Sequence, residues 1–492
     1  MALSNKPMKL TVALYLRLLA LVYLCAFAGL LPQLEGLYSI NGIAPVANYN
    51  LLVAVSSGGC LLSGLLFFGI AEPVVLFLLY LAYLHIVSVG QEFLSFQWDI
   101  LLLEAGFISI FLGRSRYFSF SERTAKIATI ALAWLTFRLM FSSGFVKIVS
   151  EAVSDSSWLS LTALTYHFET QPLPNPVAFF CNALPLFVSK AACAIALAIE
   201  LVVPFFVFAG ARARLFAAAV FCLLQIAIAL TGNYGFFNFL SAVLCLSLVT
   251  DSALERLFKF SKLSLIEQWL TKINRNAQDN TDRLAVSIEK LVAYSAFTLI
   301  AFASAISISL TVLGRDLFAI LPSPLGAVYG LCQNFGVSST YGLFAVMTRD
   351  RPELIIEGSN DGVEYKAYEF HYKVGDLYRA PPVIAPYMPR LDWQMWFEAL
   401  RAEGGGGPDR WFVHFLSALA HGDKTVLKLL KTNPFAEAPP KYLRVKLYKY
   451  KFTKPEVLFS TGQWWHREEI GVYLEQRSEA GNNEGADGAD LN

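Results

Sequence analysis

The sequence is poor in charged residues and lacks the signature motifs of common soluble enzymes. Only 16% of its 492 residues are Asp, Glu, Lys or Arg, whereas about a quarter is usual in a soluble domain. It contains no glycine-rich phosphate loop, no Gly-x-Ser-x-Gly and no His-Glu-x-x-His. No basic patch with interleaved aromatic residues is present. We therefore expect no metal, no cofactor and no nucleic-acid partner.

Cysteine pairs suited to redox chemistry are also missing. The chain has seven cysteines but no Cys-x-x-Cys, which argues against a dithiol oxidoreductase. Five of the seven fall inside long apolar runs. Cys181 and Cys332 alone are expected at an aqueous surface, and whether these two form a disulfide stays open.

Long apolar runs fill the first 314 residues, and charges return every few residues after Gly314. A spanning helix needs about 20 residues. Nine runs approach this length: 11–31, 51–71, 73–90, 98–113, 126–149, 185–209, 215–231, 233–250 and 291–313. We predict a polytopic α-helical membrane protein with about nine transmembrane helices in 1–314. A soluble α+β domain over 315–475 and a disordered, Gly- and Asn-rich tail over 476–492 are expected to follow.

Lysine and arginine are absent from three of the connecting segments, 32–50, 91–97 and 150–184. The positive-inside rule puts such segments on the non-cytoplasmic side. The soluble domain then faces the same side as the outer loop 150–184. Segment 251–290 is basic and therefore cytoplasmic, with an amphipathic run around Leu263–Leu270 suited to the membrane surface.

The soluble domain has clear strand and helix patterns. Residues Glu353–Tyr372 predict two strands joined by a hairpin turn at 359–362. The alternating run Tyr442–Phe452 predicts a strand with Leu443, Val445 and Leu447 on one face. A last strand is expected around Trp464–Leu474. Three helical patterns cover Leu391–Arg401, Trp411–His421 and Thr425–Lys431.

Ionisable residues inside the predicted membrane helices are candidates for function, because burying a charge in a bilayer is costly. They are His85, Asp99, Glu104, Arg138, Lys147 and Glu200. We expect Asp99 to pair with Lys147, and Arg138 to pair with Glu104 or Glu200, since pairing offsets desolvation. Two interpretations stay open: structural ion pairs, or a polar cavity that opens outward with Lys147 at its mouth.

The outer loop 150–184 holds the densest group of polar residues. Tyr166, His167, Glu169 and Gln171 precede three closely spaced prolines, which favour an extended chain. On a strand, His167 and Glu169 would share a face, whereas on a helix they would not. The loop is either an ordered segment whose polar groups satisfy one another, or it carries a His–Glu catalytic or binding pair. Two ligands alone do not make a metal site.

The runs Trp158–Pro176 and Phe96–Gly106 closely resemble the lipase maturation factor family. Further blocks of that resemblance, which covers roughly residues 10–475, are Tyr341–Phe344, Glu357–Gly362, Pro389–Phe397, Asn433–Phe435 and Gly462–Trp465. In animals this family resides in the endoplasmic reticulum membrane, with its C-terminal region in the lumen, and is needed for secreted lipases to fold and assemble. The resemblance implies an exported, lipase-like client and contact with membrane lipid. The absence of Asn-x-Ser/Thr favours a bacterial inner membrane, with a periplasmic soluble domain, over a lumenal one.

A shorter pattern is similar to the vitamin K-dependent carboxylase group and its horizontally transferred transmembrane relatives. It consists of Arg138, Gly144–Lys147 and Trp158-Leu159. In the carboxylase the matching lysine is a base that starts quinone chemistry. This resemblance implies an alternative function, an integral membrane enzyme that acts on a lipid-soluble substrate or quinone with Lys147 as base.

The leading hypothesis is nevertheless a maturation factor rather than an enzyme. Candidate catalytic residues under the alternative are Lys147, His167 and Glu169. The expected functional polar cluster comprises Asp99, Glu104, Arg138, Lys147, Trp158, Tyr166, His167, Glu169 and Gln171. The expected client-binding residues are Arg390, Asp392, Trp393, Trp396, Trp464 and Trp465.

Overall fold

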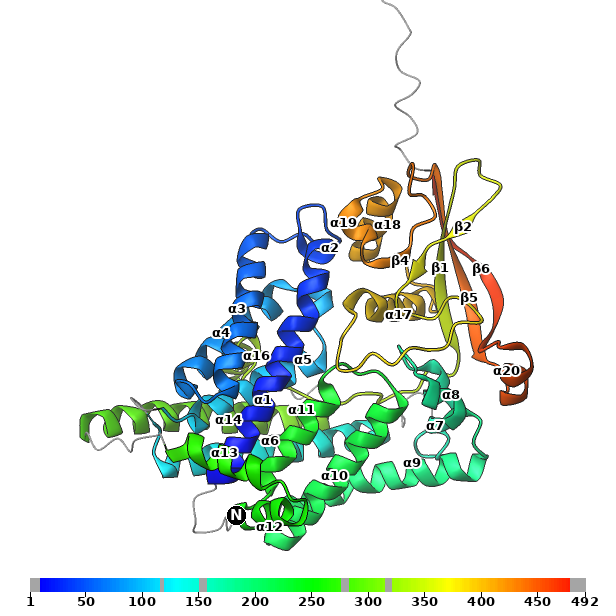
Figure 1. The fold of residues 1–492 in the computed structure, drawn as a ribbon. Coiled ribbons are helices and arrows are strands. Elements are labelled where there is room, and N and C mark those ends of the chain that lie inside the picture. The colour runs from blue at the N-terminus through cyan, green and yellow to red at the C-terminus, as the bar shows by residue number, and fades with distance from the viewer. Residues whose placement is uncertain (1–8, 116–118, 150–156, 276–282, 315–320, 478–492) are drawn as a thin grey trace, which may run out of the picture.

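The computed structural model describes residues 9–115, 119–149, 157–275, 283–314 and 321–477. A helical bundle carries a smaller domain of sheet and helices on one end (Figure 1). This arrangement confirms the predicted class, a polytopic helical membrane protein with a C-terminal α+β domain. The predicted tail beyond residue 477 lies outside the described residues.

Among the described residues, seven helices are long and apolar enough to cross a membrane, and the number rises to eight if one bent pair counts as a span. The prediction of about nine is corrected accordingly. The seven comprise α1 (Lys9–Leu30) continued into α2 (Leu34–Tyr38), α3 (Tyr49–Phe67), α4 (Glu72–Val89), α6 (Glu122–Val149), α9 (Leu186–Leu201) continued by a 3₁₀ turn (Val203–Phe208), α10 (Ala211–Thr231) and α14 (Arg283–Leu313).

Two of the nine predicted spans are short or broken. Helix α5 (Gln97–Ser109) has only 13 residues before a 3₁₀ turn, Ile110–Leu112, and most of its side chains are buried inside the bundle. The run 233–250 forms α11 (Phe237–Leu244) and a 3₁₀ turn, Cys245–Leu248, which meet α12 (Asp251–Phe260) at 115°. Apolar content alone did not distinguish a buried core helix from a spanning one.

Helices α12 and α13 (Ser264–Arg275) form the end of the bundle opposite the sheet domain (Figure 1). The amphipathic run around Leu263–Leu270 is therefore helical, as predicted. Phe260 and Leu265 are 88% and 78% exposed. The Asp251 carboxylate accepts the backbone N–H groups of Leu10 and Thr11, so α12 is tied to the start of α1.

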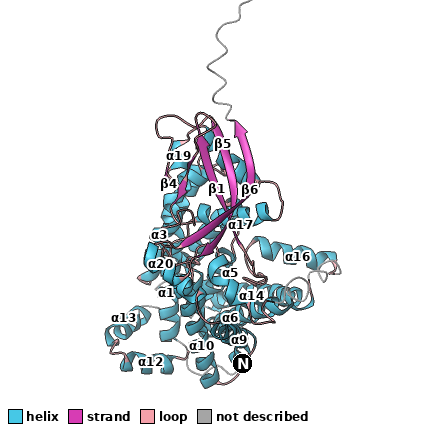
Figure 2. Ribbon diagram, turned by 90° about the vertical axis from the view of Figure 1, so that its right-hand side faces the viewer, coloured by secondary structure: helices cyan, strands magenta, loops and turns pink. Residues whose placement is uncertain are grey.

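The sheet domain contains an antiparallel sheet of order β2-β1-β5-β6, whose strands β1, β5 and β6 lie side by side in Figure 2. Its strands are β1 (Arg351–Ser359), β2 (Lys366–Ala367), β5 (Tyr442–Phe452) and β6 (Trp465–Arg477). A two-stranded sheet pairs β3 (Glu369–Phe370) with β4 (Leu430–Thr432). As predicted, a hairpin joins β1 to β2, and β5 buries Leu443, Val445 and Leu447.

Helices α17 (Arg390–Glu403) and α18 (Arg410–Ala420) cover the inner face of this sheet. Their bounds agree with two of the three predicted helices to within a few residues. The third predicted helix, Thr425–Lys431, is wrong in its second half. Helix α19 (Lys424–Leu427) ends early, and the residues after it pair as β4 with β3. Pairing with a distant strand overrode local helical preference. Helix α20 (Pro455–Thr461) connects β5 to β6.

The segment that leads into the sheet domain starts against the outside of the bundle. Helix α16 (Ser323–Asn334) packs beside α14, and the Tyr80 hydroxyl donates to the Phe335 carbonyl at 2.6 Å. Cys332 on α16 and Cys181 on α8 (Pro176–Asn182) are both free thiols. The disulfide left open above does not form in this arrangement.

Candidate functional site between the bundle and the sheet domain

Lys147 on α6 pairs with Glu200 on α9 inside the bundle. The ammonium Nζ lies 2.7 and 2.5 Å from the two carboxylate oxygens. The predicted pair of Lys147 with Asp99 is therefore wrong. Gly144, one turn before Lys147, lets the helices approach, because a Cβ there would lie 2.7 Å from the Cβ of Glu200. Close packing of α6 against α9 therefore brings Lys147 and Glu200 within pairing distance.

A cavity of about 440 Å³ lies beside this pair, between α6, α7 (Ala163–Thr170), α9 and α10. Its walls are mainly aliphatic and aromatic, and Lys147, Trp158 and His167 all line it. The Lys147 ammonium sits 5.0 Å from the centre of the Trp158 ring, a cation–π contact. Three members of the predicted polar cluster therefore meet at one cavity.

His167 faces the cavity as a neutral ring. Burial and the nearby positive charge of Lys147 lower the pKa of His167 to about 4. Its Nε2 lies 3.1 Å from the Tyr234 hydroxyl, which itself donates to the Gln171 side-chain oxygen at 2.7 Å. His167 Nε2 is therefore the donor to Tyr234, which leaves Nδ1 as an acceptor.

The backbone is strained where the cavity meets the sheet domain. Phe344 has a φ of 53°, a left-handed conformation that is uncommon for a bulky residue. Its carbonyl accepts the indole N–H of Trp158 at 3.0 Å, and its ring packs edge-on against His167 at 4.8 Å. Strain held by such contacts is typical of functional sites.

Glu169 lies apart from His167, because this part of the loop is the helix α7. Its carboxylate accepts the backbone N–H of Phe452, on β5, at 2.8 Å. Burial raises the pKa of Glu169 above its ordinary value. The alternative of a His–Glu pair is therefore excluded, since residues two apart on a helix point in different directions. The expectation that the loop's polar groups satisfy one another holds only in part for Gln171, whose amide donates to the Phe168 carbonyl within the loop and to the Thr231 carbonyl on α10.

Arg138 pairs with Glu104, one of its two predicted partners, deep in the bundle. The segment after α16 completes this site from the other side. Ser338 Oγ accepts from the Arg138 guanidinium at 2.7 Å, and the Tyr341 hydroxyl donates to Glu104 at 2.6 Å. The start of the sheet domain therefore belongs to the ion-pair network of the membrane helices.

Asp99 finds its partner in the sheet domain. Both terminal nitrogens of the Arg390 guanidinium donate to its carboxylate, at 2.6 and 2.9 Å, and the Tyr83 hydroxyl donates to it at 2.5 Å. Arg390 is 2% exposed and Asp99 is fully buried. We predicted that Arg390 contacts a client, and this is corrected: its side chain docks the sheet domain onto the bundle.

Most of the other expected client-binding residues are buried as well. Asp392 accepts the backbone N–H groups of Tyr372 and Lys373 at 2.8 Å each, and burial raises its pKa. Trp393 and Trp465 are 3% and 1% exposed, which leaves no surface for a client. Trp396 is half-buried, and its indole donates to the Thr170 carbonyl at 2.9 Å. Trp464 is half-buried against Phe179, and Tyr166 lies under the Arg349 guanidinium.

Several docking residues escaped the sequence analysis. Arg351 donates to the carbonyls of Glu169, Gln171 and Pro172. The Asn233 side chain donates to the Pro382 carbonyl and accepts the backbone N–H of Ile384. Arg17 pairs with Glu72 in the bundle. Each is a single polar residue whose partner lies far away in the sequence. Of these, Arg17 alone had a sequence signal, because it is a charge inside the apolar run 11–31, whereas Glu72 lies between two predicted runs.

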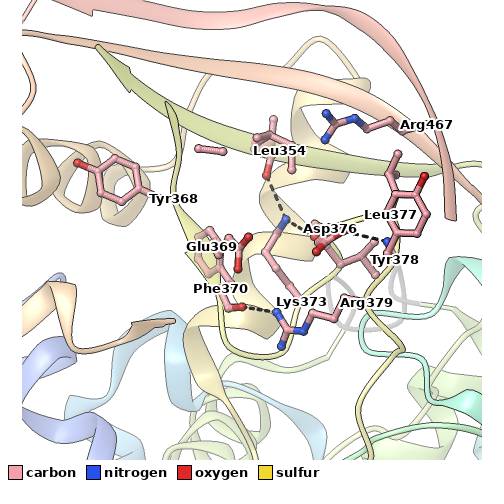
Figure 3. A pocket seen from close by; sticks show the side chains of 14 residues that line it. Leu354, Tyr368, Glu369, Phe370, Lys373, Asp376, Leu377, Tyr378, Arg379 and Arg467 are labelled. Atoms are coloured by element: carbon pink, nitrogen blue, oxygen red, sulfur yellow. Dashed lines mark hydrogen bonds between the residues drawn. The ribbon is translucent and has the colours of Figure 1, made fainter. Parts of the chain in front are cut away.

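A second cavity, of about 330 Å³, lies on the sheet domain between β1, the segment 367–379 and Arg467 (Figure 3). Lys373 crosses it and donates to the carbonyls of Leu354 and Val374, while also pairing with Glu353 at 2.8 Å. Arg379 donates to the Phe370 carbonyl at 2.7 Å. Tyr378 at its rim is 61% exposed.

Comparison with known proteins finds relatives along nearly the whole chain. The model of the lipase maturation factor transmembrane domain matches residues 49–256, and that of the C-terminal domain matches residues 337–475. Lipase maturation factor 2 of Gallus gallus is 31% identical, over 94% of this chain and 80% of the relative. Lipase maturation factor 1 of Mus musculus is 32% identical, over 87% of this chain and 74% of the relative. No solved structure matches the chain.

Proposed function

The chain belongs to the lipase maturation factor family, and from that premise we propose that it is a membrane-embedded factor for the folding or assembly of exported lipases. The match over both the membrane and the C-terminal parts carries this proposal. The membrane is a bacterial inner membrane or the endoplasmic reticulum, depending on the source, and the sheet domain works on its non-cytoplasmic side. The absence of Lys and Arg from the outer loops supports this orientation.

The exposed edge of the sheet domain is the best candidate for client contact. Strand β6 pairs only with β5 among the described strands, so its other edge offers free backbone groups. Ile470 and Val472 on this strand are 53% and 52% exposed. Exposed edge strands accept extended peptides as an added strand. A partly folded lipase supplies such segments, and the neighbouring cavity with Tyr378 offers a place for an anchoring side chain.

The alternative enzyme has less support from the geometry. Glu169 is separated from His167, and both carboxylate oxygens of Glu200 already bind the Lys147 ammonium. The cavity beside Lys147 can hold a ligand even if no reaction takes place there.

Complementation of a deletion strain tests the client surface. We expect the double variant Ile470→Asp/Val472→Asp to lower secreted lipase activity by about tenfold, because charges on the edge disrupt strand addition. The matched control is Val413→Asp on α18, where the side chain is 47% exposed. Equal lipase activity from wild type and the double variant, at equal protein levels, would remove the edge strand from the proposal.

A second comparison separates the binding factor from the enzyme. Lys147→Met combined with Glu200→Leu removes both charges of the pair and leaves no unpaired charge in the bundle. A maturation factor retains most of the secreted lipase activity with this double variant. Complete loss of activity from a protein that folds and inserts normally would favour chemistry at Lys147.

A further inference from the structure

The cavity beside Lys147 reaches the lipid-facing surface of the bundle. Two of its lining residues, Ile195 on α9 and Leu223 on α10, are 60% and 66% exposed. Both helices are candidate membrane spans. The opening between them therefore faces hydrocarbon rather than water, so a ligand that enters there must carry an apolar chain.

The size and lining of the cavity fit a hydrocarbon chain with a small polar head group. A volume of about 440 Å³ lies within the range of about 300–1,000 Å³ typical of small-molecule sites, which are apolar with a few placed polar groups. Leucine, isoleucine and alanine side chains of α9 and α10 form the outer part. Lys147, His167 and Gln225 bring polar groups to the inner part.

The charges at the inner end cancel. Lys147 and Glu200 neutralise each other, and His167 adds a neutral ring. An anionic head would have to compete with the Glu200 carboxylate, and a cationic head with the ammonium. The pairing therefore favours an uncharged head.

Gln225 shows which kind of uncharged group fits. Its side chain is 5% exposed, and its oxygen accepts from Asn238 at 2.9 Å. Within the described part of the chain, its amide nitrogen reaches only the thioether sulfur of Met140, at 3.9 Å. Sulfur is a weak acceptor, so this buried donor lacks a good oxygen partner.

We propose that this cavity binds the single hydrocarbon chain of a neutral membrane amphiphile. The chain lies between α9 and α10, and an uncharged, oxygen-bearing head group accepts a hydrogen bond from Gln225 beside the Lys147–Glu200 pair. This site is separate from the client surface on β6, and the proposal does not depend on which protein is the client.

A photolabelling experiment with a matched pair of variants tests the site. The probe is a monoacylglycerol with a photoactivatable group in its chain, added to full-length protein in phosphatidylcholine nanodiscs. Ala196→Phe fills the cavity from α9, while Ala198→Phe puts the same ring on the exposed surface of the same helix. We expect labelling of α9 and α10 to fall about tenfold with Ala196→Phe and to stay unchanged with Ala198→Phe.

Competition identifies the head group. Unlabelled monoacylglycerol should reduce labelling more strongly than a fatty acid or an alkyl phosphocholine of the same chain length. Equal labelling of the two phenylalanine variants, both folded by thermal melting, would overturn the cavity as a binding site. Stronger competition by the fatty acid would overturn the neutral head group.

Discussion

Single buried charges determine how the sheet domain sits on the bundle. Arg390 reaches Asp99 with two parallel hydrogen bonds, at 2.6 and 2.9 Å, while its third contact is the Phe93 carbonyl. This bidentate geometry is specific to arginine. Because the pair is fully enclosed, loss of one member leaves an uncompensated charge in a low-dielectric environment.

We therefore predict that Arg390→Ala loosens or releases the sheet domain. Removing one partner of a buried pair costs about 3–5 kcal/mol. Arg401→Ala is the control on the same helix, because the Arg401–Asp409 pair is 47% and 37% exposed, and exposed pairs contribute only about 0–1 kcal/mol. Thermal unfolding and limited proteolysis of the purified protein measure the difference. Comparable protease resistance for the two variants would show that Arg390 does not hold the domain.

At the scale of helices and strands, two close approaches of backbone decide the geometry of the cavity. Gly144 brings α6 against α9, and Gly342 brings the segment after α16 against Val146 on α6, where a Cβ would lie 2.7 Å from a valine methyl carbon. Small residues at such crossings let membrane helices pack closely. The cavity thus depends on spacing between elements as much as on its own side chains.

Gly144→Ala should therefore separate α6 from α9 and weaken the Lys147–Glu200 pair. We expect a loss of about 1–3 kcal/mol, as for other overpacked sites. Gly64→Ala on α3 is the matched control, since a Cβ there meets nothing within 4 Å and alanine gains up to about 1 kcal/mol in a helix. Melting temperatures in detergent compare the two. A Gly144→Ala protein as stable as Gly64→Ala would show that the helices can shift without cost.

Sequence patterns predicted the helices and strands better than they predicted which side chains pair with one another. The strand Tyr442–Phe452 matches the structure to the residue, because alternation is a local signal. The partner of Asp99 could not be predicted, since Arg390 lies 291 positions away and was assigned to a surface. Likewise, the helix α7 excludes one of the two alternatives left open for the loop, a pair formed by His167 and Glu169. Ionisable residues in apolar runs did identify buried ion pairs, among them Arg138–Glu104 and Lys147–Glu200, because each buried charge demands a partner.

At the scale of the whole molecule, the two ends of the bundle differ in what packs on them. The sheet domain packs on α7 and α8 at one end, whereas α12 and α13 lie at the other (Figure 1). The outer loop and the sheet domain therefore share a side, as predicted from charge. Basic residues gather near α12 and α13, among them Arg256, Lys259 and Lys262. The positive-inside rule predicts that this end is cytoplasmic, and this prediction needs an experiment.

Labelling of an introduced cysteine in the host membrane tests this orientation. Phe459→Cys on α20 and Leu265→Cys on α13 place thiols at positions that are 77% and 78% exposed. The seven native cysteines are buried or half-buried, so wild type gives the background. With a membrane-impermeant maleimide applied from the non-cytoplasmic side, we expect labelling of the Phe459→Cys protein alone. The Leu265→Cys protein should react only after the membrane is permeabilised. The reverse pattern would place the sheet domain in the cytoplasm, where an exported lipase could not reach β6 after crossing the membrane, and the proposed client surface would fall with it.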